Sequence, residues 1–148
     1  MIDDFRDFLR ELVAAHAQFL VVGAHALSVH GIPRATGDLD VWVRPDTENA
    51  SRLMMALDRF GAPTDDLGIV AADFVKPDVV AQLGVPPYRI DIPTSISGVD
   101  FDSAWSDRVE GDIAGVHVPV LGRRAFVVNK RAAGRTKDAA DLEALGEN

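Results

Sequence analysis

The chain has 148 residues, of which 47 % are hydrophobic and 26 % charged; this composition is typical of one folded domain and excludes general disorder. It contains no cysteine, which excludes disulfides, thiolate metal sites and a cysteine nucleophile. Its formal net charge of −8 argues against non-specific binding to nucleic acid. We therefore expect a single domain that spans residues 1–148.

The beginning of the chain predicts a cytoplasmic location. Residues 1–6 read MIDDFR, so charge begins at the third residue and the apolar core of a signal peptide is missing. No apolar run approaches the ~20 residues of a membrane-spanning helix. We expect a cytoplasmic enzyme or binding module with no membrane partner.

Hydrophobic periodicity predicts helices that alternate with short strands. The predicted helices cover residues 4–16, 25–30, 45–60, 67–74, 123–133 and 137–145. The predicted strands cover residues 19–22, 39–43, 79–83, 88–92, 109–113 and 116–120. This order lacks regular βαβ spacing, so it favours the α/β class in its α+β form: a mixed sheet flanked by helices, with a C-terminal helical pair.

Histidine and tryptophan give no functional signal. The four histidines show none of the spacings of a metal site. His16 falls on the apolar face of the first predicted helix, where we expect it to be part of the core. Trp42 and Trp105 are expected to pack against apolar neighbours.

The most informative segment joins the first two predicted strands. A buried strand ends at Gly23-Ala24 and a helix follows directly, so free backbone N–H groups and the positive end of the helix dipole face outward. Such turns bind phosphate groups. Gly23 has no side chain that would block a close approach. We expect a phosphate-binding turn here.

Asp38 and Asp40 lie on one face of the second predicted strand. Residues two apart on a strand have Cα atoms about 6–7 Å apart, so both carboxylates can reach one cation. Ligation by oxygen alone suits Mg²⁺, with Mn²⁺ as the alternative. The two residues could also be surface acids of an edge strand, but the preceding glycine turn favours a metal site.

Asp91, on the predicted strand 88–92, is a third candidate acid. It could bind a second cation or act as a general base. Two cations about 4 Å apart would stabilise the attacking and leaving oxygens of a phosphoryl transfer. Asp91 could instead form an ion pair with Arg89 or with Arg34, and both interpretations stay open.

The charge of the chain is unevenly distributed. Residues 113–137 contain six basic and no acidic side chains, which indicates either a local anion site or a solvated helix face. Lys130 belongs to this segment and could simply extend its ammonium group into solvent. Asp138 and Asp141 follow it and are expected to form helix caps or ion pairs that hold the basic segment.

In this order, the segments resemble the nucleotidyltransferase superfamily that includes the DNA polymerase β-like enzymes. They look most similar to small bacterial AbiEii-type and MenT-type toxin nucleotidyltransferases. Together the matching segments cover most of residues 19–145. The segments that carry the resemblance are Val22-Gly23-Ala24, residues 34–43 (RATGDLDVWV), residues 82–99 around Arg89-Ile90-Asp91, and residues 129–141.

This resemblance implies a minimal nucleotidyltransferase fold and a specific set of site residues. It implies that Asp38, Asp40 and Asp91 are catalytic and bind the metal. It further implies nucleotide contacts from Gly23, Ala24, Arg34, Thr36 and Lys130. Arg34 and Thr36 could instead be loop residues that cap local backbone. Ala24 replaces the Gly or Ser usual in the family, which keeps the backbone amide but removes a hydroxyl contact to phosphate.

The resemblance also implies a reaction. A nucleoside monophosphate would move from a nucleoside triphosphate such as ATP to a hydroxyl acceptor, and pyrophosphate would be released. The implied acceptor is a structured RNA, with the tRNA 3′ end as the first candidate, and the implied partner is a cognate antitoxin. A protein or small-molecule acceptor is the alternative among enzymes. A non-catalytic toxin–antitoxin binding component is the alternative outside them.

Overall fold

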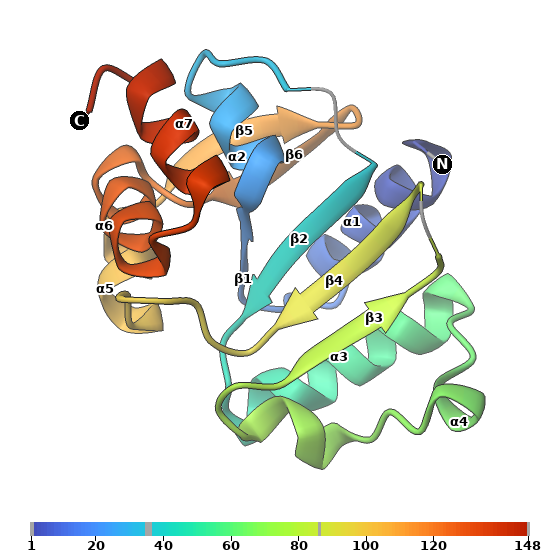
Figure 1. Ribbon diagram of the computed structural model, residues 1–148. Coiled ribbons are helices and arrows are strands. Elements are labelled where there is room, and N and C mark those ends of the chain that lie inside the picture. The colour runs from blue at the N-terminus through green and yellow to red at the C-terminus, as the bar shows by residue number, and fades with distance from the viewer. Residues whose placement is uncertain (1, 35–36, 86, 148) are drawn as a thin grey trace.

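The fold is built on one six-stranded sheet, seen in the computed structural model of Figure 1, which describes residues 2–34, 37–85 and 87–147. The strands lie in the order β3-β4-β2-β1-β6-β5. They are β1 (Phe19–Val22), β2 (Asp38–Val43), β3 (Val80–Leu83), β4 (Arg89–Pro93), β5 (Val109–Ile113) and β6 (Val116–Val120).

Seven α-helices and one 3₁₀ helix are found within the described residues. They are α1 (Ile2–Ala14), α2 (Gly23–Val29), α3 (Thr47–Phe60), α4 (Thr64–Leu67), the 3₁₀ helix η1 (Ala71–Val75), α5 (Phe101–Ser106), α6 (Arg123–Ala133) and α7 (Thr136–Ala144). Local chemistry sets several ends: Asp46 caps α3 by accepting from the N–H of Asn49 at 2.8 Å. Gly134 adopts φ +65° and ends α6. No helix of the described residues is long and apolar enough to cross a membrane.

The sheet is mixed, as its sequence pattern predicted. β2 pairs in parallel with β4, and β1 pairs in parallel with β6. The other neighbours, β1 with β2, β3 with β4 and β5 with β6, are antiparallel. The sheet therefore places the carboxyl half of β1 beside the amino half of β2, where Val22 is the register partner of Asp40.

Different helices pack against the two faces of the sheet. Helices α1 and α3 lie side by side behind the sheet in Figure 1, and their apolar stripes meet through an edge-to-face contact of Phe8 with Phe60. On the other face, Trp42 packs edge-on against Phe101 of α5 and donates its indole N–H to the carbonyl oxygen of Thr94 at 3.1 Å. Trp42 is thus a core residue, as expected.

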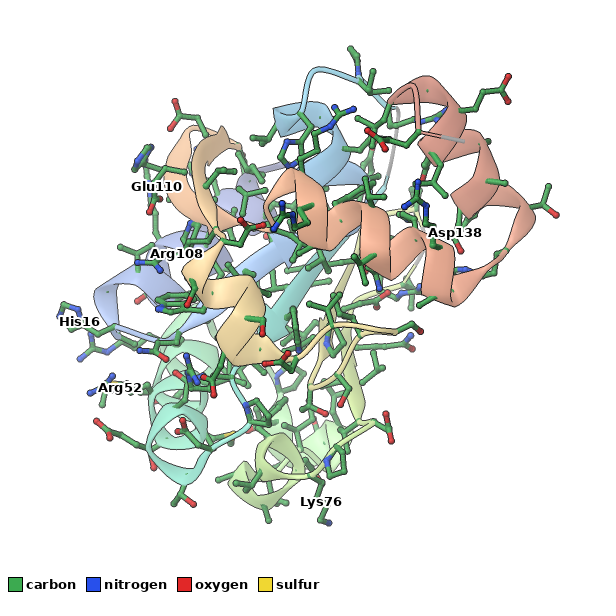
Figure 2. The ribbon with its side chains drawn as sticks, turned by 90° about the vertical axis from the view of Figure 1, so that its left-hand side faces the viewer. His16, Arg52, Lys76, Arg108, Glu110 and Asp138 are labelled. Carbon is green, nitrogen blue, oxygen red and sulfur yellow. The ribbon has the colours of Figure 1, made fainter. Side chains whose placement is uncertain are left out.

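Three details differ from the sequence-based expectations. The predicted helix 67–74 is wrong, because Gly68 adopts φ +69° and ends α4, and η1 forms separately. His16 is exposed, because α1 ends at Ala14 and His16 takes φ +58° in the following turn; Figure 2 shows it at the margin of the molecule. Helix α5 was not predicted, although Asp100 caps it by accepting from the N–H of Ser103 at 3.1 Å.

Candidate active site

The site begins where β1 ends. Gly23 follows the last residue of β1, adopts φ +70° and starts α2. A Cβ atom at this position would lie 2.4 Å from Oδ2 of Asp40. Glycine is therefore required here for two reasons, its left-handed backbone and the close approach of the Asp40 carboxylate.

Parallel pairing of β2 with β4 brings the three candidate acids together. Asp40 is the register partner of Asp91, and Asp38 is the register partner of Arg89. Because alternate residues of a strand share a face, all four side chains lie on one face of the sheet. The sequence placed Asp38 and Asp40 on one strand face, and the strand register adds Asp91 and Arg89.

Arg89 joins two of these acids. Its Nε and Nη2 donate to the two oxygens of Asp91, at 2.7 and 3.0 Å, and Nη2 also lies 3.4 Å from Oδ2 of Asp38. The paired, side-by-side contact with Asp91 is the geometry in which arginine binds a carboxylate most strongly. Of the two ion pairs considered for Asp91, the structure contains the one with Arg89.

Asp40 has the least favourable environment for a negative charge. Burial raises its pKa to about 6, with the carboxylates of Asp91 and Asp38 contributing in the same direction; Lys137 and Lys130 oppose the shift. Within the described residues, no ion pair to Asp40 is found. A carboxylate crowded by other carboxylates is stabilised by a nearby cation.

These residues fit a divalent cation in their chemistry. All of the donors are carboxylate oxygens, which are the ligands of Mg²⁺, and no ion pair to Asp40 is found in the part of the chain that the structure describes. No group of three or more His, Asp or Glu side chains in the described parts of the chain is already gathered as a metal centre. Asp38 and Asp40 are the residues that would hold the cation, whereas Asp91 is engaged by Arg89.

A network of ion pairs forms the opposite wall. Lys130 of α6 is buried, with its Nζ 3.1 Å from Oδ1 of Asp138 and 3.2 Å from Oδ2 of Asp141. Asp141 also pairs with Arg34 at 2.8 Å, and Asp138 with Arg135 at 2.7 Å. Figure 2 shows Asp138 in the region where α6 and α7 meet. Asp138 and Asp141 thus hold the basic segment by ion pairs, as predicted.

Asp138 is fully buried and stays ionised because of this network. Burial alone would raise its pKa, but hydrogen bonds from Arg135 and Lys130 outweigh that effect and lower the pKa to about 2. Lys130 is therefore held by two carboxylates, and its ammonium charge is largely compensated inside the protein.

Lys137 differs from the other basic residues around the site. Arg34, Arg89, Lys130 and Arg135 each have a carboxylate partner. For Lys137, no ion pair is found within the portion of the chain that the structure describes. The side chain is exposed, and its charge lowers the pKa of Asp40, so it acts on the acidic side of the site.

A cavity of about 760 Å³ connects the acidic and basic sides. Its volume is within the ~300–1,000 Å³ of small-molecule sites. Seven of the eight predicted site residues line it: Gly23, Ala24, Arg34, Asp38, Asp40, Asp91 and Lys130. The eighth, Thr36, lies outside the described residues.

The cavity also contains residues that sequence reasoning did not assign to the site. An apolar wall comes from Val80, Pro93 and Ile96, and a polar edge from Ser97 and Asn129, whose amide donates to the Ser97 carbonyl oxygen at 3.0 Å. Most of these residues lie in segments that carry the resemblance, but no role at the site was predicted for them, because their proximity depends on how β3, β4 and α6 meet. Arg89 and Lys137 could have been found from their spacing to Asp91 and Lys130.

Comparisons with known proteins support the fold. No protein-family model matches the sequence, and no curated protein matches it significantly. A crystal structure from Thermotoga maritima, provisionally named a nucleotidyltransferase, is similar with a TM-score of 0.61 and 16 % sequence identity. The similarity covers 95 % of this chain and 88 % of that one. At this identity the chain shares a fold, a mixed sheet flanked by helices, with a protein named as a nucleotidyltransferase.

Proposed function

We propose that the chain is a metal-dependent nucleotidyltransferase. The observation that carries this proposal is the placement of Asp38, Asp40 and Asp91 on one sheet face, beside the Gly23 turn and opposite a basic wall, in a single cavity. The similar fold of the Thermotoga maritima protein supports the same activity class.

The proposed reaction assigns a role to each side of the cavity. An acceptor hydroxyl attacks the α-phosphorus of a nucleoside triphosphate; the new O–P bond forms as the bond between that phosphorus and the β-phosphate oxygen breaks, and the hydroxyl proton passes to solvent water. Pyrophosphate leaves. A bound Mg²⁺ would supply charge stabilisation to the phosphate oxygens, with Asp38 and Asp40 as its ligands. The backbone at Gly23 and Ala24 would contact phosphate.

The basic side would bind the rest of the triphosphate. Lys137 is exposed, and no ion pair to it is found in the described residues, so it can contact phosphate without breaking an internal bond. Lys130 and Arg34 line the same cavity, and their ion pairs with Asp141 fix their positions there. The apolar wall of Val80 and Ile96 offers a surface for a nucleobase.

For the acceptor we propose a structured RNA, with a tRNA 3′ end as the first candidate and a toxin–antitoxin role as the setting. The basic segment 113–137 supports this proposal. Two of its arginines are already paired within the protein, because Arg123 and Arg131 lie 3.2 and 3.7 Å from the carboxylate of Glu147. Arg124 remains as a basic residue on the exposed side of α6. A protein or small-molecule acceptor is the competing possibility.

Labelling identifies both the reaction and the acceptor. The protein is incubated with Mg²⁺, a total cell extract and each nucleoside triphosphate labelled at the α-phosphate. We expect label in RNA with the wild type and with the control Asp58→Asn, an exposed acid on α3, but none with Asp40→Asn. Label on protein or on a small molecule would replace the RNA acceptor and keep the activity. No label anywhere, with triphosphate binding intact, would favour a non-catalytic binding component.

A further inference from the structure

Arg89 lies between two of the acids, Asp91 and Asp38, and contacts both. It comes from β4, two residues before Asp91, and its register partner across the sheet is Asp38. Its guanidinium therefore reaches the third acid along its own strand and the first acid across the sheet. The sheet register, and not a flexible loop, sets this position.

The contact with Asp91 uses both carboxylate oxygens. Nε lies 2.7 Å from Oδ1 and Nη2 lies 3.0 Å from Oδ2, while the Asp91 side chain is only 13 % exposed. A divalent cation at Asp91 would have to displace two charge-assisted hydrogen bonds in a partly buried site. The contact with Asp38 is longer, 3.4 Å, and involves one guanidinium nitrogen.

Asp40 lies beside Asp91 across the sheet but is not a member of this ion pair. Its Oδ2 faces the Gly23 turn, and no ion pair to it is found among the described residues. The three acids therefore differ in their partners: Arg89 holds both oxygens of Asp91 and lies 3.4 Å from one oxygen of Asp38, whereas the Asp40 carboxylate lies against the Gly23 turn.

We propose that Arg89 takes the place of a second divalent cation: it neutralises Asp91 and leaves the chain with a single metal site, at Asp38 and Asp40. The inference rests on the proposed function and decides between the roles considered for Asp91. Asp91 is then a positioning residue for Arg89, and the guanidinium is a fixed positive charge beside the reacting phosphate. Charge can be stabilised there by arginine as well as by a metal ion.

Manganese titration of the purified full chain tests this without any reaction. Free Mn²⁺ is measured by electron paramagnetic resonance, with no nucleotide present. We expect one Mn²⁺ per chain in the wild type and none in Asp40→Asn. Two Mn²⁺ per chain in the wild type, at comparable affinity, would overturn the inference while leaving a metal-dependent nucleotidyltransferase possible. No Mn²⁺ at all would overturn the metal site in both proposals.

Three variants locate the role of the Arg89–Asp91 pair. Arg89→Met frees Asp91, so we expect a second Mn²⁺ or an affinity about tenfold higher, because a positive charge a few ångströms away is lost. Arg34→Met is the matched control: it removes the same charge from the same cavity, but its partner is Asp141, so Mn²⁺ stoichiometry stays at one. Unchanged Mn²⁺ binding in Arg89→Met would count against the inference.

The double variant Arg89→Met/Asp91→Asn gives the decisive measurement. It removes the pair with no change in net charge, so we expect one Mn²⁺ bound within about threefold of the wild-type affinity. If Asp91 were a metal ligand, the double variant would lose roughly 10–100-fold in affinity, as losses of metal-site residues do. Thermal melting of each variant checks the fold, and Arg89→Gln replaces Arg89→Met if the latter does not fold.

Discussion

Lys130 and Asp138 form a buried ion pair, with Nζ and Oδ1 3.1 Å apart and side chains that are 7 % and 0 % exposed. Removing one member of such a pair leaves an uncompensated charge in the interior. The pair therefore makes α7 part of the site, because it joins this last helix to Lys130, one of the α6 residues that line the cavity.

Asp138→Ala should destabilise the protein by about 3–5 kcal/mol, because Lys130 is left buried with only Asp141 as its partner. Urea unfolding followed by circular dichroism measures the loss. The control Glu143→Ala, an exposed acid of α7, should change stability by less than about 0.5 kcal/mol. The double variant Lys130→Met/Asp138→Leu should recover much of the loss; equal losses in the single and double variants would contradict the pairing.

Lys137→Ala should weaken ATP binding by about tenfold, since it removes a charge that no internal ion pair engages in the described residues. Its stability should stay within about 0.5 kcal/mol of the wild type, because the side chain is exposed. Isothermal titration with ATP and Mg²⁺ measures the affinity. Arg131→Ala, an exposed charge on α6, serves as the control and should bind ATP normally. Equal affinities for all three proteins would remove Lys137 from the nucleotide site.

Gly23→Ala should weaken metal binding strongly, although the substitution adds only one methyl group. The new Cβ would lie 2.4 Å from Oδ2 of Asp40 and would require φ +70° of an alanine, so the carboxylate must move. We expect at least tenfold weaker Mn²⁺ binding together with a stability loss of about 1–2 kcal/mol. Ala24→Ser is the neighbouring control and should bind Mn²⁺ like the wild type. Normal Mn²⁺ affinity in Gly23→Ala would show that Asp40 does not need this close approach.

The raised pKa of Asp40 predicts that, without metal, the protein becomes less stable as this carboxyl group ionises. Its pKa is about 6 in the folded protein and near 3.8 when unperturbed, so the folded state holds this proton more tightly. The contribution of Asp40 to the free energy of unfolding is therefore lost as the pH rises from about 4 through 6. With a chelator present, Asp40→Asn should be more stable than the wild type by about 3 kcal/mol at pH 8 and nearly equal at pH 4.

Added Mg²⁺ provides the control for that comparison. It should raise the melting temperature of the wild type at pH 8 and leave Asp40→Asn unchanged, because ligand binding stabilises only a folded state that binds it. Parallel stability profiles of the two proteins across the whole pH range would contradict the assigned environment of Asp40.

Local patterns in the sequence were enough to predict most elements. The strand 19–22 was placed correctly from its continuous apolar run, the helix that ends at Phe60 from its apolar stripe and Gly61, and the helix 123–133 from the break at Gly134. The segment 61–79 was not, because it is a series of short turns in which Gly68 interrupts the apolar pattern. His16 was misplaced because the predicted helix extended two residues beyond the end of α1 at Ala14.

The candidate site also has a part that the sequence predicted and a part that depends on the tertiary structure. Asp38 and Asp40 were recognisable as a pair because the alternation of one strand places them together. That Arg89 holds Asp91, and that Lys130 is enclosed by Asp138 and Asp141, depends on strand register and on how α6 meets α7. Sequence spacing was compatible both with an ion pair of Asp91 and with Asp91 as a metal ligand, and it did not distinguish these two roles.

The parallel register of β2 and β4 also determines when the site can form during folding. Asp40 and Asp91 are neighbours across the sheet, yet α3, α4, η1 and β3 all lie between them in the chain. Parallel neighbours need such a long crossover, and contacts between distant segments form slowly. The mutually repelling carboxylates of Asp40 and Asp91 can therefore meet only once the chain extends through β4, and a chain that stopped before β4 would have a glycine turn with no third acid beside it.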